Sequence, residues 1–160
     1  MTSTIFREIG KLIAAVTVCQ LAGLIGVLTS GDTGSYYKKL DTPSFAPPSS
    51  VFGPVWIALY TLMGIALYMV WNRRDKGNAR SRALGLFGVQ LALNAAWSPA
   101  FFGLQQPGLG LIVIILLLVA IIATILAFWP VAAVAALLLI PYLLWVGFAT
   151  ALNFEIWRNN

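Results

Sequence analysis

The sequence predicts an all-α, polytopic membrane protein: a bundle of five transmembrane helices with a long proline-rich loop between the first two. Of the 160 residues, 60% are hydrophobic and only 9% are charged, and the mean hydropathy is +0.88. Soluble domains carry roughly a quarter of charged residues. The apolar residues also come in runs close to the roughly 20 residues that an α-helix needs to cross a bilayer. Both observations place the chain in a membrane.

Five apolar runs form one predicted integral membrane domain over residues 1–160. The runs lie at about 9–28, 52–71, 83–102, 109–129 and 131–157. The last boundary rests on Trp129-Pro130, because the sequence is otherwise almost unbroken from Leu109 to Trp157. Trp favours the membrane interface, and Pro favours the first turn of a helix. Without a break at this point the chain would have four spans.

The basic residues predict the orientation. On one side of a five-span arrangement lie Arg7, Lys11, Arg73, Arg74, Lys76, Arg80 and Arg82, and on the other lie Lys38, Lys39 and Arg158. The positive-inside rule then places the N-terminus and the loop 72–82 in the cytoplasm, and the first loop and the C-terminus on the opposite side. The net charge of +5 is concentrated next to the membrane, which favours contact with anionic lipid over nucleic acid. The short chain favours a prokaryotic cell membrane.

Few residues are suited to catalysis. The chain has no histidine, and its single cysteine, Cys19, is expected to be buried in the first helix. The five carboxylates lie near or beyond the ends of the predicted helices. A proton relay needs ionisable groups at membrane depth, and structural metal sites need His and Cys ligands. We therefore predict no catalytic residue, no metal site and no cofactor.

Three of the predicted helices carry aromatic faces. At 100° per residue, Gln90, Asn94, Trp97 and Phe101 share one face of the third helix, and the small residues Gly85, Gly88, Ala92 and Ala96 share the opposite face. The same arithmetic groups Phe52, Trp56, Tyr60, Met63 and Leu67 in the second helix, and Tyr142, Trp145, Ala149 and Asn153 in the fifth. Such faces are typical of helix packing, and equally of a pocket for a flat, mostly apolar molecule.

Three motifs carry a resemblance to a known family. The stretches "TPSFAPPSSVFGPVWIALYTLMGIALYMVW", "QLALNAAWSPAFF" and "IPYLLWVGFATALNFEIWRNN" resemble the tryptophan-rich sensory protein and translocator protein family, also called peripheral benzodiazepine receptors. The resemblance implies five transmembrane helices, usually in a dimer, and a pocket toward the first loop. It also implies porphyrin ligands such as protoporphyrin, cholesterol in animal members, and synthetic isoquinolines and benzodiazepines.

The resemblance also implies pocket residues. Trp56, Asn94 and Trp145 match positions that line the family's pocket, Ala149 matches a position where side-chain size affects binding, and Phe101 matches an aromatic element. The full predicted binding set is Phe45, Pro47, Phe52, Trp56, Tyr60, Asn94, Trp97, Phe101, Tyr142, Trp145 and Ala149.

The loop at about 30–51 is predicted to be a lid over the cavity; the alternative is a rigid spacer with aromatic residues at the membrane interface. The prolines Pro43, Pro47, Pro48 and Pro54 restrict the backbone and predict a stiff, extended path.

Two departures from the family pattern bear on the ligand. Tyr36-Tyr37 and Phe45 stand where the family commonly has tryptophans, which weakens any tryptophan-dependent photochemistry in the loop. The sterol motif of animal members has a tyrosine where this chain has Phe154, so its hydroxyl is lost and the case for cholesterol is weak.

Three hypotheses follow. The leading one is a membrane receptor or transporter that binds a tetrapyrrole, heme-related molecules included, or another flat hydrophobic ligand. The second is an enzyme that degrades porphyrins with light and oxygen, which only the resemblance supports. The third is a regulatory membrane protein that acts through helix contacts. The small face with Gly88, Ala92 and Ala96 predicts self-association in a homodimer.

Overall fold

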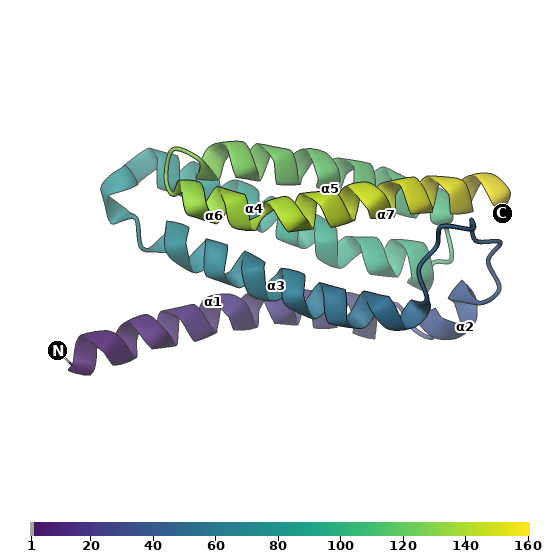
Figure 1. The fold of residues 1–160 in the computed structure, drawn as a ribbon, viewed down its shortest axis with the longest axis horizontal. Helices are drawn as coiled ribbons and strands as arrows, with labels where there is room; N and C mark the ends of the chain where they lie inside the picture. The colour runs from purple at the N-terminus through teal and green to yellow at the C-terminus, as the bar shows by residue number, and fades with distance from the viewer. Residues whose placement is uncertain (1) are drawn as a thin grey trace.

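In the computed structural model, which describes residues 2–160, the chain forms a bundle of long helices that lie side by side (Figure 1). The long helices are α1 (Thr2–Leu28), α3 (Ser49–Trp71), α4 (Gly77–Ser98), α5 (Pro107–Phe128) and α7 (Ile140–Asn159). The shorter elements are α2 (Thr33–Tyr37), the 3₁₀ turn η1 (Arg74–Lys76), the π-helical turn η2 (Pro99–Gly103) and α6 (Ala133–Leu138). The described chain is therefore all-α.

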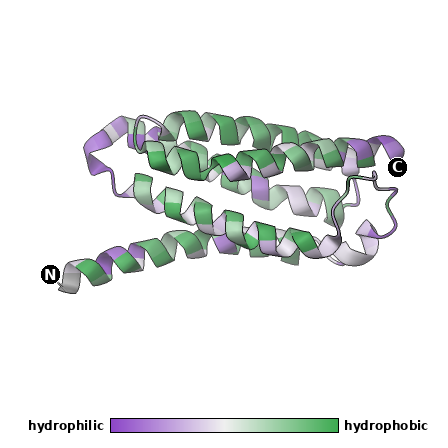
Figure 2. Cartoon of the chain, in the orientation of Figure 1, coloured by the Kyte–Doolittle hydropathy of each residue, from purple (hydrophilic) through white to green (hydrophobic). Residues whose placement is uncertain are grey.

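Four segments are long and apolar enough to cross a membrane: Thr4–Leu28, Ser49–Trp71, Pro107–Phe128 and Ala133–Asn159. The last combines α6 and α7. Helix α4 is equally long but more polar, since it carries two arginines in its first turns and buried Gln90 and Asn94 further along. Figure 2 shows apolar residues along most of each long helix and polar residues gathered mainly at the two ends of the bundle.

Helix α1 begins well before the predicted start at residue 9 and so includes Glu8. Glu8 thus lies inside the helix and still near its N-terminal end, level with Asn72 at the end of α3. The Glu8 carboxylate accepts hydrogen bonds from Lys11 at 2.7 Å, Asn72 at 3.0 Å and Tyr68 at 3.2 Å. These partners satisfy the charge, which is why a carboxylate is tolerated inside this helix.

The chain breaks after α5, as Trp129-Pro130 predicts, but Pro130 lies in the connector and not in the first turn of the next helix. A second proline, Pro141, lies at the start of α7 and separates it from α6. Because Pro141 has no N–H, it cannot donate to the carbonyl of Leu137 as an uninterrupted helix would require. The predicted helix 131–157 is consequently two helices.

The first loop is less extended than its prolines predict. Residues 33–37 form α2, whose first turn is capped by the Asp32 carboxylate accepting from the backbone N–H of Ser35 at 3.1 Å. Hydrogen bonding to Ser35 lowers the pKa of Asp32. At the other end of the loop, Pro54 lies inside α3, not in the connector. Between α1 and α3, residues 29–32 and 38–48 lack helix.

Close contact between α1 and α3 depends on a glycine. A Cβ atom on Gly64 would lie 2.4 Å from the Cα of Val16, so the two backbones meet there with no side chain between them. Small residues allow this approach between helices in a membrane. One turn further along α1, Cys19 is fully buried, which confirms the expectation for this cysteine.

Gly64→Ala should therefore destabilise the bundle. The added methyl group forces α1 and α3 apart, and overpacking of this kind costs about 1–3 kcal/mol. Gly10→Ala is the matched control, because that helical glycine of α1 has open space around it. Unfolding of both variants by a denaturing detergent measures the effect. Equal stability of the two variants would contradict the close contact.

Candidate ligand-binding cavity

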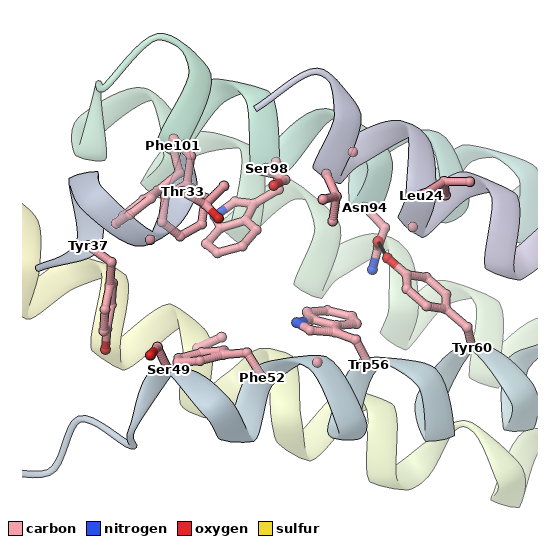
Figure 3. Close-up of a pocket in the computed structure, with 18 of the residues that line it drawn as sticks. Leu24, Thr33, Tyr37, Ser49, Phe52, Trp56, Tyr60, Asn94, Ser98 and Phe101 are labelled. Atoms are coloured by element: carbon pink, nitrogen blue, oxygen red, sulfur yellow. Dashed lines mark hydrogen bonds between the residues drawn. The ribbon is translucent and has the colours of Figure 1, made fainter. Parts of the chain in front are cut away.

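A cavity of about 510 Å³ lies between α1, α3, α4 and α7, with α2 and η2 at one end (Figure 3). Its walls are mostly apolar. Of the described residues that line it, none carries a charge. A pocket of this size and composition suits a small, neutral and largely apolar molecule.

Aromatic rings form two opposite walls. On α3, Trp56 stacks on Tyr60 with ring centroids 5.5 Å apart, and Phe52 lies one turn earlier along the helix. On the other side, Trp97 stacks on Phe101 at 5.4 Å. Figure 3 shows Trp56 and Phe101 on opposite sides of the cavity. A flat ligand between these walls would meet rings on both faces, which is a favourable arrangement for aromatic contact.

The π-helical turn η2 adds a further ring that the helical spacing did not predict. Here the N–H of Leu104 donates to the carbonyl of Pro99, five residues back, at 2.8 Å. The wider turn brings the adjacent residues Phe101 and Phe102 both to the cavity. In a regular helix these neighbours would point about 100° apart. Such π turns frequently occur at functional sites.

A chain of four side chains runs from the cavity into the bundle. The hydroxyl of Tyr60 donates to Asn94 Oδ1 at 2.5 Å, and Asn94 Nδ2 donates to the hydroxyl of Tyr142 at 2.8 Å. The Tyr142 hydroxyl in turn donates to Gln90 Oε1 at 2.8 Å. All four residues are buried. The chain joins α3, α4 and α7 and satisfies most of the polar groups that these helices bury.

A second pair of hydrogen bonds positions Trp97. Its Nε1–H donates to Asn153 Oδ1 at 3.1 Å, and Asn153 Nδ2 donates to the carbonyl of Pro107 at 2.8 Å. Asn153 thus connects α7 to α4 and to the start of α5. It lines the cavity and is almost completely buried.

The structure brings seven of the eleven predicted binding residues into the lining and leaves four outside it. The seven are Phe52, Trp56, Tyr60, Asn94, Trp97, Phe101 and Ala149. Outside the lining are Phe45, Pro47, Tyr142 and Trp145.

Each of these four has a different position. Tyr142 lies behind Asn94, to which it is hydrogen-bonded. Trp145 packs edge-on against the ring of Phe52 at 5.9 Å. Phe45 is half exposed and packs against Phe148 at 6.2 Å. Pro47 is half-buried in the loop.

Helix α1 is the main contribution that the sequence reasoning missed. It supplies Gln20, Gly23, Leu24, Gly26 and Val27 to the lining. A Cβ on Gly23 would lie 2.2 Å from the ring of Tyr60, so only glycine leaves room for that ring. The one available signal was the helical spacing of Gln20, Gly23 and Val27, which places a polar and a small residue on one face of an otherwise apolar helix.

The first loop covers the end of the cavity near α2. The Tyr37 ring packs against Phe52 at 5.8 Å, and the Tyr36 ring against Phe101 at 6.2 Å. Burial raises the pKa of both tyrosines. Farther along the loop, the backbone N–H of Asp41 donates to Asn160 Oδ1 at 3.0 Å, and Asn160 Nδ2 donates to the Asp41 carbonyl at 3.2 Å. The loop is thereby joined to the end of α7.

The fold and the cavity define an all-helical integral membrane protein with a largely aromatic internal cavity. Comparison with known families then identifies it further, because the sequence model of the TspO/MBR family matches residues 14–158. This chain belongs to that family.

Proteins from a range of organisms are similar in sequence to this chain over most of its length. The chain is 42% identical over 155 residues to the tryptophan-rich protein TspO of Chlorobaculum tepidum, covering 96% of this chain and 98% of that protein. It is 44% identical over 133 residues to the translocator protein of Homo sapiens, covering 81% of this chain and 78% of that protein. It is 34% identical over 145 residues to the tryptophan-rich sensory protein of Cereibacter sphaeroides, covering 91% and 88%.

Tyr142→Phe should destabilise the protein more than Tyr60→Phe. Loss of the Tyr142 hydroxyl leaves Asn94 Nδ2 and Gln90 Oε1 without these partners, and each unpaired buried group costs about 1–3 kcal/mol. Loss of the Tyr60 hydroxyl removes one partner from Asn94, which borders the cavity. Denaturing-detergent titrations of both variants provide the test, and a larger loss for Tyr60→Phe would contradict the buried chain.

Proposed function

We propose that this protein is a membrane receptor or transporter that binds a tetrapyrrole, such as protoporphyrin or a heme-related molecule, or a similar flat hydrophobic ligand in its internal cavity. The observation that carries this proposal is the pair of facing aromatic walls, with Trp56 on one and Trp97 on the other. A macrocycle between them would be covered on both faces. Family membership supports a receptor-like role, and the lining composition favours this ligand class.

Polar atoms at the sides of the cavity would orient such a ligand. Asn94 and Tyr60 lie at its inner end, and Ser98 lies on the α4 side, where its hydroxyl is 2.7 Å from that of Ser30. Since the lining groups are uncharged, the carboxylates of a porphyrin would remain outside the aromatic region. Lys38 and Lys39 follow α2 directly and are exposed at that end, where they are suited to bind those carboxylates.

The proposal adds α4 to the four apolar segments that are long enough to cross a membrane, which gives five membrane spans. This helix is less apolar than the others, but Gln90 and Asn94 are buried in the bundle and need not meet lipid. Its arginines, Arg80 and Arg82, lie in the first turns and belong to the basic segment 72–82. The orientation proposed from these charges places that loop in the cytoplasm and the first loop on the other side. The first loop would act as the lid of the cavity.

Ala149→Leu should weaken ligand binding. Ala149 is buried and lines the cavity, so the larger side chain would occupy space that the ligand needs. Ala151→Leu is the matched control, because Ala151 lies on the same helix and is exposed. Saturable quenching of tryptophan fluorescence by protoporphyrin in nanodiscs measures the affinity. We expect Ala149→Leu to raise Kd at least about tenfold, which corresponds to about 1.4 kcal/mol.

The control should bind as the parent protein does. Quenching that does not saturate, or that is the same in the parent and both variants, would indicate partitioning of porphyrin into the bilayer and would reject the binding function.

We also propose a homodimer formed through the small face of α4. Gly85, Gly88, Ala92 and Ala96 are all exposed, and added Cβ atoms on the two glycines would meet no other atom within 4 Å. This face is therefore left free by the rest of the chain. Small residues at such spacing let a second helix approach closely.

Ala92→Leu should disrupt self-association, because the larger side chain prevents close approach of two α4 helices. Ala58→Leu, on an exposed position of α3, is the control and should leave the dimer intact. Chemical cross-linking in nanodiscs and analytical ultracentrifugation in detergent measure the oligomeric state. A dimer that persists equally in both variants would exclude this face.

A further inference from the structure

We infer that the cavity opens sideways into the bilayer between α1 and α3, so that its ligands enter from the lipid phase. The inference rests on the proposed function, since it concerns how a ligand reaches the same cavity. We call this opening the α1–α3 portal and define it by Leu24 and Val27 on α1 and Gly53 and Ile57 on α3.

The residues of the portal belong to the cavity and to the outer surface together. Leu24, Val27 and Ile57 all line the cavity, yet they are 50%, 58% and 61% exposed. Gly53 also lines the cavity and is exposed, and it has no side chain to fill the space between the helices. By contrast, the cavity residues Asn94, Phe101 and Asn153 are buried. The wall of the cavity is therefore thinnest at the portal between α1 and α3.

The helices that α1 contacts along its length explain why the portal is open. Toward the middle of the bundle, Gln20 Nε2 donates to the carbonyl of Ile57 at 3.0 Å and to the hydroxyl of Thr61 at 3.1 Å. Two residues past the end of α1, the hydroxyl of Ser30 pairs with that of Ser98 on α4 at 2.7 Å. Among the described residues, no side-chain hydrogen bond joins α1 to α3 past Gln20.

The end of α1 nearest α2 is also held close to α4 by a glycine. A Cβ on Gly26 would lie 3.3 Å from the carbonyl oxygen of Ala95. Helix α1 therefore follows α3 in one half of the bundle and α4 in the other. The space that it leaves beside α3 is the portal.

The chemistry of the portal defines what can pass. Its side chains are purely hydrocarbon, so a charged group would lose its hydration there without gaining a partner. The loop end of the cavity is covered by Tyr36 and Tyr37 and joined to α7 through Asn160. A neutral, flat molecule dissolved in the bilayer is suited to the lateral route. A phospholipid acyl chain has the same apolar character and serves as a probe.

Quenching by brominated lipid tests the portal without any porphyrin. A variant that keeps Trp56 and replaces the other tryptophans with Phe reports from inside the cavity. In nanodiscs of phosphatidylcholine with dibrominated acyl chains, Trp56 fluorescence should be strongly quenched relative to unbrominated lipid. Gly53→Leu in this background should reduce the quenching by at least half, because the new side chain fills the portal.

Gly10→Leu is the matched control. Both glycines are exposed, lie in helices and have no atom within 4 Å of an added Cβ, so neither change should disturb folding. The control should retain full quenching. Unquenched Trp56 in brominated lipid, or equal quenching in Gly53→Leu and Gly10→Leu, would overturn the inference.

A second measurement separates this inference from the proposed function. With all tryptophans present, protoporphyrin dimethyl ester, a neutral porphyrin, is preloaded in vesicles and transferred to nanodiscs that contain the protein. Gly53→Leu should slow the appearance of quenching severalfold, whereas Gly10→Leu should leave its rate as in the parent protein. Unchanged kinetics would contradict lateral entry. If no porphyrin binds while the brominated lipid still quenches Trp56 through the portal, the proposed function fails and the portal stands.

Discussion

The hydrogen-bonded chain from Tyr60 through Asn94 and Tyr142 to Gln90 is the interaction on which the rest of this structure depends. In a membrane, helices gain little from burying apolar side chains, because lipid is as apolar as the protein interior. Polar groups inside the bundle must instead find partners on neighbouring helices. This chain ties α3, α4 and α7 together at one depth, and the cavity begins directly beside it. The same side chains thus position the helices and form the polar end of the proposed binding site.

The cavity itself follows from the changing partners of α1. Near its N-terminal half, α1 is held to α3 by the hydrogen bonds of Glu8 and by the contact at Gly64. Toward its other end it approaches α4 at Gly26, and Ser30, just past that end, pairs with Ser98 of α4. A helix that leaves one neighbour for another leaves a space between them, and aromatic rings from α3, α4 and η2 line it. Glycines act here as the points of close approach, so the volume of the cavity depends as much on absent side chains as on present ones.

Much of the site could be predicted from helical spacing, because the faces of a regular helix follow directly from residue number. Trp56 and Tyr60 on α3 and Asn94 and Trp97 on α4 reach the lining from the faces that the sequence groups together. The prediction was less complete where the helix is irregular. The π turn brings Phe102 to the cavity beside Phe101. Pro54 lies inside α3, although proline disfavours the interior of a helix. Trp145, which the family pattern places in the pocket, packs against Phe52 outside the lining. Such details depend on neighbouring elements that a single-helix pattern does not contain.

The sequence by itself determined that this is an all-helical membrane protein of the TspO/MBR family, with aromatic faces on three helices and a small-residue face on one. These properties are local, since composition, run length and periodicity depend on residues close together in the chain. Only the tertiary structure decided that α1 forms a cavity wall, that Asn153 orients Trp97, and that the seam beside Gly53 is open. Each of these results from the distance between segments far apart in the chain. That distance is set by backbone contacts at glycines and by hydrogen bonds between helices, which no periodicity within one helix encodes.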